Sequence, residues 1–129
     1  MNRIKLLIVD DEIVVQQSCV DIFNEKSACY DITTVSSGEE ALRTLEENQF
    51  DIILTDIKMP GLPGLQLLPA IKKKYPNTAI IVITGYATVR TAVEAMKLGA
   101  VDFIPKPFTP DEIYNAVEKV AARLRESHQ

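Results

Sequence analysis

The sequence has little of several features that would point to particular classes of protein. It contains only two cysteines, Cys19 and Cys29, and their spacing matches no metal-binding or redox motif. Its longest apolar stretches, such as Ala79–Ile83, are far shorter than the roughly 20 residues that a membrane-spanning helix needs. Acidic residues interrupt the apolar run near the N-terminus and no small-residue cleavage site follows, so we expect no signal peptide and a cytoplasmic location.

Charge and histidine content argue against two further classes. The net charge is −4, whereas direct binding to a nucleic-acid backbone needs a positive surface. The single histidine, His128, lies in the C-terminal tail, so a histidine phosphotransfer protein is not expected. No low-complexity linker or internal repeat divides the 129 residues, and we expect one domain.

Short β-rich apolar runs alternate along the chain with segments of helical periodicity. The first, third and fourth runs are continuously apolar, as expected for strands that are covered on both faces. This alternation predicts an α/β fold, in which a parallel sheet carries helices on both faces. The expected strands are Ile4–Val9, Tyr30–Val35, Ile52–Thr55, Ala79–Ile83 and Asp102–Ile104.

Five helices are expected between and after these strands. Ser37 and Thr109 are each followed three residues later by a glutamate, which is the pattern of a helix capping box. Apolar residues at helical spacing predict core-facing stripes. The stripes are Ala41, Leu42 and Leu45 in the second helix; Val89, Ala92, Val93 and Met96 in the fourth, which ends at Gly99; and Ile113, Val117, Val120 and Leu124 in the last.

Polar residues stand where the apolar strands stop. Asp10 and Asp11 follow the first strand, Asp56 follows the third, Thr84 the fourth and Lys106 the last. Each has an ordinary explanation when taken alone, as a helix cap, a turn residue or a solvated side chain. In an open parallel sheet, however, ligands bind beyond the carboxyl ends of the strands. The conjunction therefore predicts one functional site.

The chemistry of this set favours phosphoryl transfer. Adjacent carboxylates repel one another and need a compensating cation, and hard oxygen ligands suit Mg²⁺. A carboxylate beside such an ion can attack a phosphoryl group while a lysine neutralises its oxygens. We expect Asp56 to be the acceptor and Asp10 with Asp11 to hold the metal. Lys106 would then supply positive charge, and Thr84 would contact the phosphoryl group.

Four segments in this order resemble the receiver domain of two-component response regulators: LLIVDDE, DIILTDIKMPGLPGLQLL, IIVITGYATVRTAVEAMKLGA and DFIPKPF. The resemblance covers residues 1–129 as a single receiver domain, with a core at about residues 3–124. It implies a flavodoxin-like, doubly wound sheet of five parallel strands in the order 2-1-3-4-5 with five helices. It also implies a signalling module, phosphorylated by a sensor histidine kinase, that promotes only its own phosphorylation and dephosphorylation.

The resemblance assigns roles to individual positions. Asp56 matches the phosphoacceptor, Asp11 the direct metal ligand and Asp10 a ligand acting mainly through water. The backbone carbonyl of Lys58 matches a further metal ligand, and the Lys58 side chain, with that of Tyr86, occupies positions that tune the phosphoryl lifetime.

The remaining matched positions concern the switch. Thr84 matches the switch hydroxyl, Lys106 the lysine of the pattern, and the Lys106–Pro107 bond one that is usually cis. Phe103 matches the switch aromatic, where tyrosine is frequent, so its inward and outward positions would differ only in packing. An ordinary packing role for Phe103 stays open.

The segment from Gly85 to Phe108 is similar to receivers of nitrogen-regulation-type enhancer-binding transcription activators. That similarity implies a transcriptional output, reached through the fourth helix, the fifth strand and the fifth helix. The chain is then either a receiver from a longer regulator or a stand-alone version, and a homodimer is one assembly that it allows. Candidate residues of the output face are Glu94, Lys97, Phe103 and Tyr114.

Three alternatives remain at the level of sequence. A Mg²⁺-dependent phosphohydrolase also uses an aspartate nucleophile, but it places that residue after the first strand with another aspartate two positions later. A flavodoxin-type electron carrier needs a phosphate-binding loop that is missing after the first strand. A degenerate receiver that only docks a partner is disfavoured by the complete acidic set.

Overall fold

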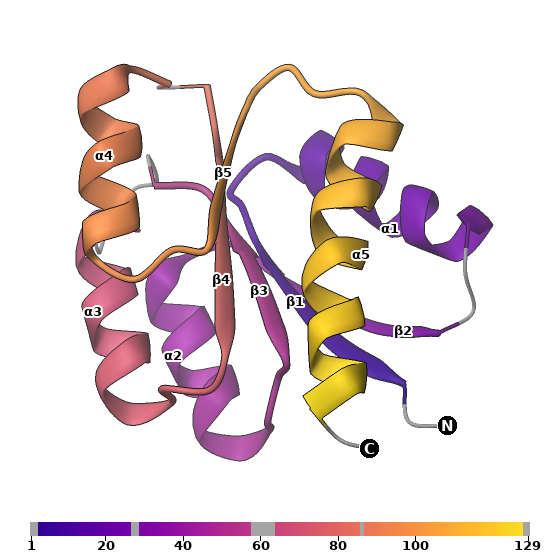
Figure 1. The fold of residues 1–129 in the computed structure, drawn as a ribbon, viewed down its shortest axis with the longest axis horizontal. Helices are drawn as coiled ribbons and strands as arrows, with labels where there is room; N and C mark the ends of the chain where they lie inside the picture. The colour runs from indigo at the N-terminus through magenta and orange to yellow at the C-terminus, as the bar shows by residue number, and fades with distance from the viewer. Residues whose placement is uncertain (1–2, 27–28, 58–63, 86, 128–129) are drawn as a thin grey trace.

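The structure is a computed structural model that describes residues 3–26, 29–57, 64–85 and 87–127. Strands and helices alternate along the whole described chain (Figure 1). In order they are β1 (Ile4–Val9), α1 (Ile13–Lys26), β2 (Tyr30–Val35), α2 (Gly38–Glu47), β3 (Ile52–Thr55), α3 (Gly64–Lys74), β4 (Ala79–Thr84), α4 (Val89–Lys97), β5 (Asp102–Pro105) and α5 (Pro110–Ser127).

The five strands form one parallel sheet in the order β2-β1-β3-β4-β5. The predicted strand order is therefore confirmed, and the predicted strands differ from the observed ones only in that β4 and β5 each extend one residue further. The central strands β3 and β4 are buried along their whole length. Continuous apolar sequence and burial on both faces thus occur together, as parallel sheets require.

Helices cover both faces of the sheet (Figure 1). Alternate residues of each strand point to opposite faces, and they divide the core into two clusters. One contains Leu6, Ile8 and Ile81 with residues of α1 and α5. The other contains Leu7 and Val82 with residues of α2, α3 and α4. The sheet is therefore the middle layer of three.

Two predicted helix starts are present. The Ser37 hydroxyl accepts a hydrogen bond from the Glu40 backbone N–H at 3.1 Å, and the Glu40 carboxylate reaches back to the N–H of Ser36. At α5 the Thr109 hydroxyl accepts from the Glu112 N–H, and the Glu112 carboxylate accepts from the Thr109 N–H. These reciprocal bonds satisfy N–H groups that a helix start leaves without intrahelical partners.

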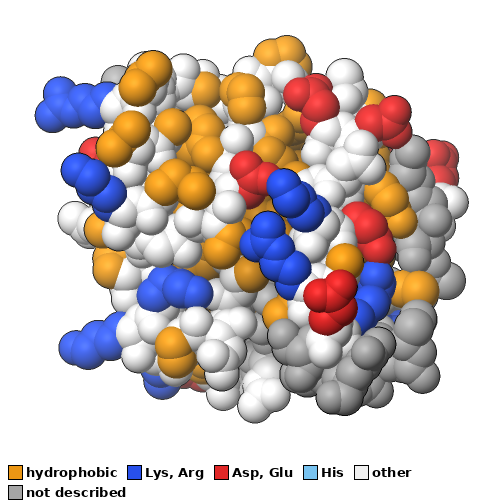
Figure 2. All heavy atoms as spheres, in the orientation of Figure 1, with side chains coloured by type: hydrophobic (Ala, Val, Ile, Leu, Met, Phe, Trp, Pro, Cys, Tyr) orange, Lys and Arg blue, Asp and Glu red, His pale blue; other side chains and the backbone are white. Residues whose placement is uncertain are grey.

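The predicted core stripe of α4 is wrong. Val89 is 83% exposed, Val93 48% and Met96 47%. The helix instead packs through the small side chains of Thr91 and Ala95, which are buried. Small residues let α4 lie close to the sheet while its larger apolar residues face outward. Hydrophobic side chains are accordingly visible at the surface on the α4 side of the molecule (Figure 2, upper left).

The predicted stripes of α2 and α5 are confirmed. Ala41 and Leu45 are buried and Leu42 packs against the same cluster. In α5 the first three members are buried and the fourth, Leu124, is partly buried against the other cluster. Among the helices that the structure describes, none combines the length and the apolar character that crossing a bilayer would take.

Tyr114 does not lie where it was predicted. Its ring centroid is 5.8 Å from that of Phe23 and 6.5 Å from that of Tyr30, so it belongs to an aromatic cluster with α1 and β2. The Tyr30 hydroxyl donates to Glu118, which also accepts from Arg125 at 2.7 Å. Because α5 shares its face of the sheet with α1, this side of the helix turns away from α4. Tyr114 is therefore removed from the predicted output face.

Candidate functional site

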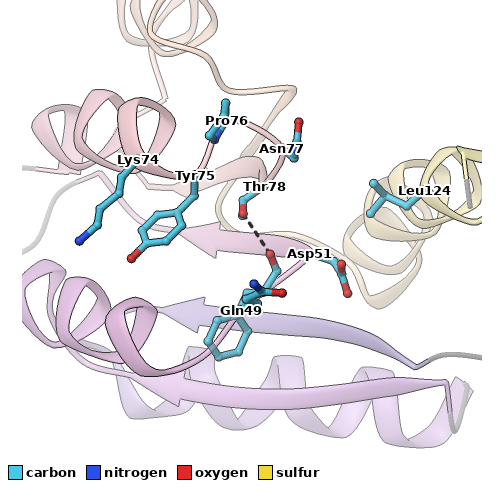
Figure 3. A pocket seen from close by; sticks show the side chains of 9 residues that line it. Gln49, Asp51, Lys74, Tyr75, Pro76, Asn77, Thr78 and Leu124 are labelled. Carbon is cyan, nitrogen blue, oxygen red and sulfur yellow. Dashed lines mark hydrogen bonds between the residues drawn. The ribbon is translucent and has the colours of Figure 1, made fainter.

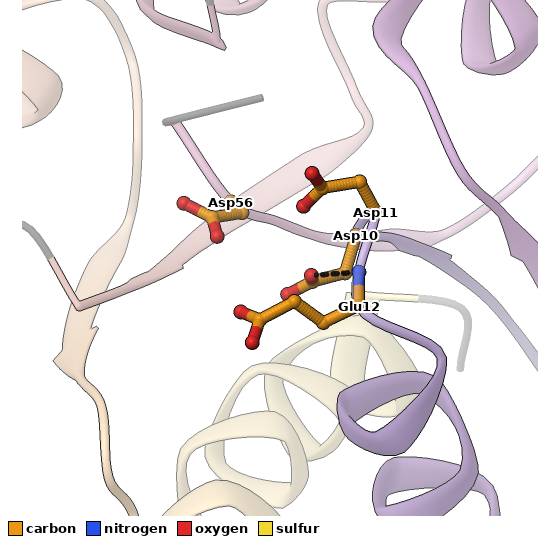
Figure 4. Close-up of side chains that lie close together, drawn as sticks. All are labelled: Asp10, Asp11, Glu12 and Asp56. Carbon is orange, nitrogen blue, oxygen red and sulfur yellow. Dashed lines mark hydrogen bonds between the residues drawn. The ribbon is translucent and has the colours of Figure 1, made fainter. Parts of the chain in front are cut away.

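The predicted site residues that the structure describes meet at the carboxyl ends of the strands. Asp10 follows β1, Asp56 follows β3, Thr84 ends β4 and Lys106 follows β5. Parallel strands bring these sequence-distant positions to one edge. Figure 4 shows the side chains of Asp10, Asp11 and Glu12 extending from the end of β1 toward Asp56.

Lys106 joins the acidic residues. Its Nζ lies 2.8 Å from Asp10 Oδ2, 2.8 Å from Asp56 Oδ2 and 2.8 Å from Glu12 Oε1. The Lys106 side chain is 13% exposed, whereas those of Asp10 and Asp56 are 0% and 6% exposed. Lys106 thus pairs with two buried carboxylates, and this pairing offsets the free-energy cost of burying their charges.

Burial and pairing act in opposite directions on these groups. Burial raises the pKa of Asp10, and the hydrogen bonds from Lys106 and from the Glu12 N–H only partly oppose it. For Lys106 burial acts to lower the pKa, but the hydrogen bonds to Asp10, Asp56 and Glu12 outweigh burial and raise it. Lys106 therefore stays protonated throughout the physiological pH range, beside Asp56.

Asp10 has both carboxylate oxygens engaged. Oδ1 accepts from the Glu12 backbone N–H at 2.9 Å (Figure 4). Oδ2 accepts from Lys106. Asp11, by contrast, is exposed. This difference fits the expectation that Asp11 contacts a metal ion directly and Asp10 does so mainly through water.

Glu12 is a member of the site that the sequence reasoning missed. One carboxylate oxygen each from Asp10, Asp11, Glu12 and Asp56 lies within 4.8 Å of the others. Glu12 directly follows the acidic pair at the end of the first predicted strand, and this adjacency was the available signal. The four donors are hard oxygens, which is the ligand chemistry that Mg²⁺ prefers. The residues present thus fit a divalent cation.

Thr84 and Phe103 lie on neighbouring strands at this edge. Thr84 is fully buried, and its carbonyl accepts the Lys106 backbone N–H at 2.8 Å. Phe103, opposite Val82 in the sheet register, is partly buried against the cluster beneath α4. Lys58 and Tyr86, for which the sequence predicted roles, lie outside the described residues.

The segment after β5 shapes the surroundings of Lys106. The Lys106–Pro107 bond is cis, as predicted. Beside it lies a groove of about 580 Å³ lined by Val14, Ile22 and Phe108 as well as Lys106. Val14 is 78% exposed. The carboxylate cluster therefore opens next to an apolar surface formed by α1 and the β5–α5 segment.

A second hollow lies at the opposite end of the sheet. It has a volume of about 610 Å³, and Thr78 and Leu124 are among the residues that line it (Figure 3). The Thr78 hydroxyl donates to the Phe50 carbonyl at 3.0 Å and so joins the segments that precede β3 and β4. Because Asp56 follows β3, this hollow is separate from the acidic site.

Comparison with known proteins identifies relatives of the chain. The family model described as response regulator receiver domain matches residues 6–118. The DNA-binding transcriptional regulator NtrC of Escherichia coli K12 is 39% identical over 97 residues, covering 75% of this chain and 21% of the relative. The transcriptional regulatory protein ZraR of Salmonella typhimurium is 33% identical over 129 residues, covering 98% and 28%. The chain thus spans about a quarter of the length of these relatives.

Solved structures show the same architecture. The signal receiver domain of a putative Luxo repressor protein from Vibrio parahaemolyticus superposes with a TM-score of 0.91 at 26% identity, covering 98% of this chain and 95% of that one. A CheY-like receiver domain protein from Methanospirillum hungatei gives 0.88 at 29% identity, with 97% and 99% covered. The predicted flavodoxin-like fold is thereby confirmed.

Proposed function

The chain belongs to the response regulator receiver domain family, and we propose that it is a phosphoacceptor switch in which Asp56 receives a phosphoryl group from a sensor histidine kinase. The observation that carries the proposal is the contact of Lys106 Nζ with Asp56 Oδ2 at 2.8 Å. It places a cation beside a carboxylate that directly follows β3, the middle strand of the sheet, within a cluster of four carboxylates.

The transfer exchanges one bond for another. A carboxylate oxygen of Asp56 forms a bond to phosphorus while the P–N bond to the donor imidazole breaks, and its electron pair remains on the imidazole nitrogen. Lys106 neutralises charge on the phosphoryl oxygens during this exchange. Asp56 is 4% exposed, so the nucleophile is shielded from bulk water but reached from the strand ends.

We assign the metal site to Asp10, Asp11, Asp56 and the backbone carbonyl of Lys58, of which the last lies outside the described residues. When bound, Mg²⁺ would neutralise charge on the carboxylates and on the phosphoryl oxygens. The chain's own contribution is to gather the oxygens at one strand edge before the ion arrives. The affinity for Mg²⁺ is therefore expected to depend on Asp11, whose carboxylate is exposed.

Phosphorylation would add about −1.5 to −2 charges and three acceptor oxygens at Asp56. Thr84 would turn its hydroxyl toward these oxygens, and Phe103 would move into the space that Thr84 leaves. The burial of Thr84 and the partial burial of Phe103 on adjacent strands support this coupling. The charge biases an existing two-state equilibrium rather than creating a new structure.

The output surface in this proposal is centred on α4 and β5. Its support is the apolar surface of Val89, Val93 and Met96, which α4 leaves exposed, flanked by Glu94 and Lys97. Exposed apolar patches of this kind mark sites of protein association. The partner would be an output domain or a second copy of the chain, and a transcriptional output follows by analogy with relatives that are named transcriptional regulators.

The kinase would approach through the groove beside Lys106. A phosphohistidine must come within bonding distance of Asp56, so the surface around it has to contact the donor protein. Val14 and Phe108 line this groove, and Ile13 is 73% exposed at its α1 side.

We place the module in the cytoplasm, with no direct contact to nucleic acid or membrane.

Acetyl phosphate can donate a phosphoryl group to Asp56 with acetate as the leaving group, so labelling with it tests the assigned acceptor directly. With Mg²⁺ present, we expect acid-labile phosphorylation, seen as a rise of one phosphoryl group in protein mass, in the native chain and not in Asp56→Asn. Asp51→Asn, at the other end of β3, is the matched control and should label normally. Persistent labelling of Asp56→Asn would contradict the assignment, whereas steady turnover of a phosphomonoester would favour the alternative, a Mg²⁺-dependent phosphohydrolase.

A further inference from the structure

The ammonium group of Lys106 has a distinct partner for each of its protons. A lysine offers three N–H donors and no acceptor, and Asp10, Asp56 and Glu12 each place one oxygen 2.8 Å from Nζ. The resting lysine is thus fully occupied by carboxylates. A phosphoryl oxygen can gain a hydrogen bond from Lys106 only if one of these three bonds is given up.

The three partners differ in what their release would cost. Asp10 is completely buried, and its other oxygen is held by a backbone N–H. Freeing it would leave a buried, unpaired charge, which is strongly unfavourable. The Glu12 side chain is 60% exposed, so water can solvate its carboxylate as soon as it leaves. Of the two carboxylates that remain unmodified after phosphorylation, Glu12 is by far the easier to release.

We propose that Glu12 is a positioning residue that holds Lys106 in the resting state and yields its place to the phosphoryl group. This inference rests on the proposed function of Asp56. Glu12 competes with the phosphoryl oxygens for one proton of Lys106, and it therefore favours the unphosphorylated state. Shortening or removing the Glu12 side chain frees that proton in advance and makes the phosphorylated state easier to reach.

Beryllofluoride, a phosphoryl mimic added with Mg²⁺, provides the binding test. Glu12→Ala removes charge and reach, Glu12→Asp keeps the charge but shortens the side chain, and Glu25→Ala removes a charge from the exposed far end of α1 as the matched control. Because exposed ion pairs are weak, we expect both Glu12 variants to bind beryllofluoride about 1.5- to 5-fold more tightly than the native chain. Glu25→Ala should bind like the native chain.

A second readout is independent of the metal and of phosphorylation. In protein without divalent cations, the ¹⁵N resonance of the Lys106 ammonium reports how well its protons are held. Exchange of these protons with water should be slower in the native chain and in Glu25→Ala than in Glu12→Ala or Glu12→Asp. Equal exchange rates in all four proteins would overturn the proposal.

The binding experiment has two further outcomes that overturn it. If Glu12→Asp binds beryllofluoride like the native chain while Glu12→Ala binds more tightly, charge at a distance acts rather than contact with Lys106. If Glu12→Ala weakens Mg²⁺ binding about tenfold or more, Glu12 is a required Mg²⁺ ligand and not a positioning residue for Lys106. Failure of the proposed function itself looks different, because the native chain would then bind no beryllofluoride at all.

Discussion

Replacing Lys106 with methionine would test how the acidic site is held together. The change keeps an aliphatic chain but leaves Asp10 and Asp56, at 0% and 6% exposure, without their shared cation. Removing one partner of a buried ion pair costs about 3–5 kcal/mol. Because 13% of the lysine side chain reaches solvent, we expect the lower end, about 3 kcal/mol, from this range.

Urea unfolding without divalent cations would measure this loss as a change in the free energy of unfolding. For a chain of this size a loss of about 3 kcal/mol corresponds to roughly 10 °C in Tm. Lys119→Met, an exposed position on α5, is the matched control and should stay within about 0.5 kcal/mol of the native chain. Mg²⁺ should stabilise the Lys106→Met variant at least as much as the native chain, because a bound cation adds stability by mass action.

The pH dependence of the same variant has a definite sign. Burial raises the pKa of Asp10, and the hydrogen bond from Lys106 opposes this rise. Without Lys106 the folded-state pKa of Asp10 rises further above its unfolded value. The resulting destabilisation is complete above the folded-state pKa and vanishes below the unfolded value, where both states bind the proton. The difference in free energy of unfolding between the native chain and Lys106→Met should therefore become smaller as the pH falls. If the variant is as stable as the native chain at pH 7 without cations, or if the difference in free energy of unfolding widens in acid, Lys106 does not stabilise the fold by pairing with Asp10 and Asp56.

Two further predictions concern the groove and a turn. Val14 lies in the groove and is 78% exposed. Val14→Asp should slow phosphoryl transfer from the cognate kinase about tenfold, since burying a valine contributes about 1.5 kcal/mol. Labelling by acetyl phosphate is the control and should not change; an equal loss of labelling by the kinase and by acetyl phosphate would contradict a role of the groove in binding the kinase. Gly99→Ala should lower the free energy of unfolding by about 1–3 kcal/mol, because Gly99 has φ +113° and an added Cβ would lie 2.9 Å from Lys72 Cγ. Gly85→Ala, where a Cβ would meet no described atom within 4 Å, is the comparison, and similar losses in both variants would contradict this explanation.

The sequence was most informative where one physical requirement decided the outcome. Strands buried on both faces need continuous apolar runs, so β3 and β4, and β1 apart from the exposed Lys5, could be predicted almost residue by residue. Their ends then located the site, because parallel strands finish at a common edge. This topology predicted that Asp10 and Lys106, 96 positions apart in the chain, lie at the same edge, whereas their direct contact at 2.8 Å was not predicted.

The sequence was misleading where spacing was taken for burial. The stripe Val89, Val93 and Met96 has the helical period of a core face, yet it is exposed because Thr91 and Ala95 face the sheet. Periodicity identifies a helix but does not say which of two apolar faces is covered. Tyr114 likewise could not be placed without knowing that it packs against Phe23.

We expect Asp56, which follows β3, to become an acyl phosphate. Borohydride reduction converts an aspartyl phosphate to homoserine, which peptide mass spectrometry locates in the chain. After treatment with acetyl phosphate and Mg²⁺ and then with borohydride, we expect homoserine at position 56 and at no other aspartate. Homoserine at position 10 or 11, or a phosphoryl group that remains on a serine or threonine after borohydride treatment, would contradict the assignment of Asp56 as the acceptor.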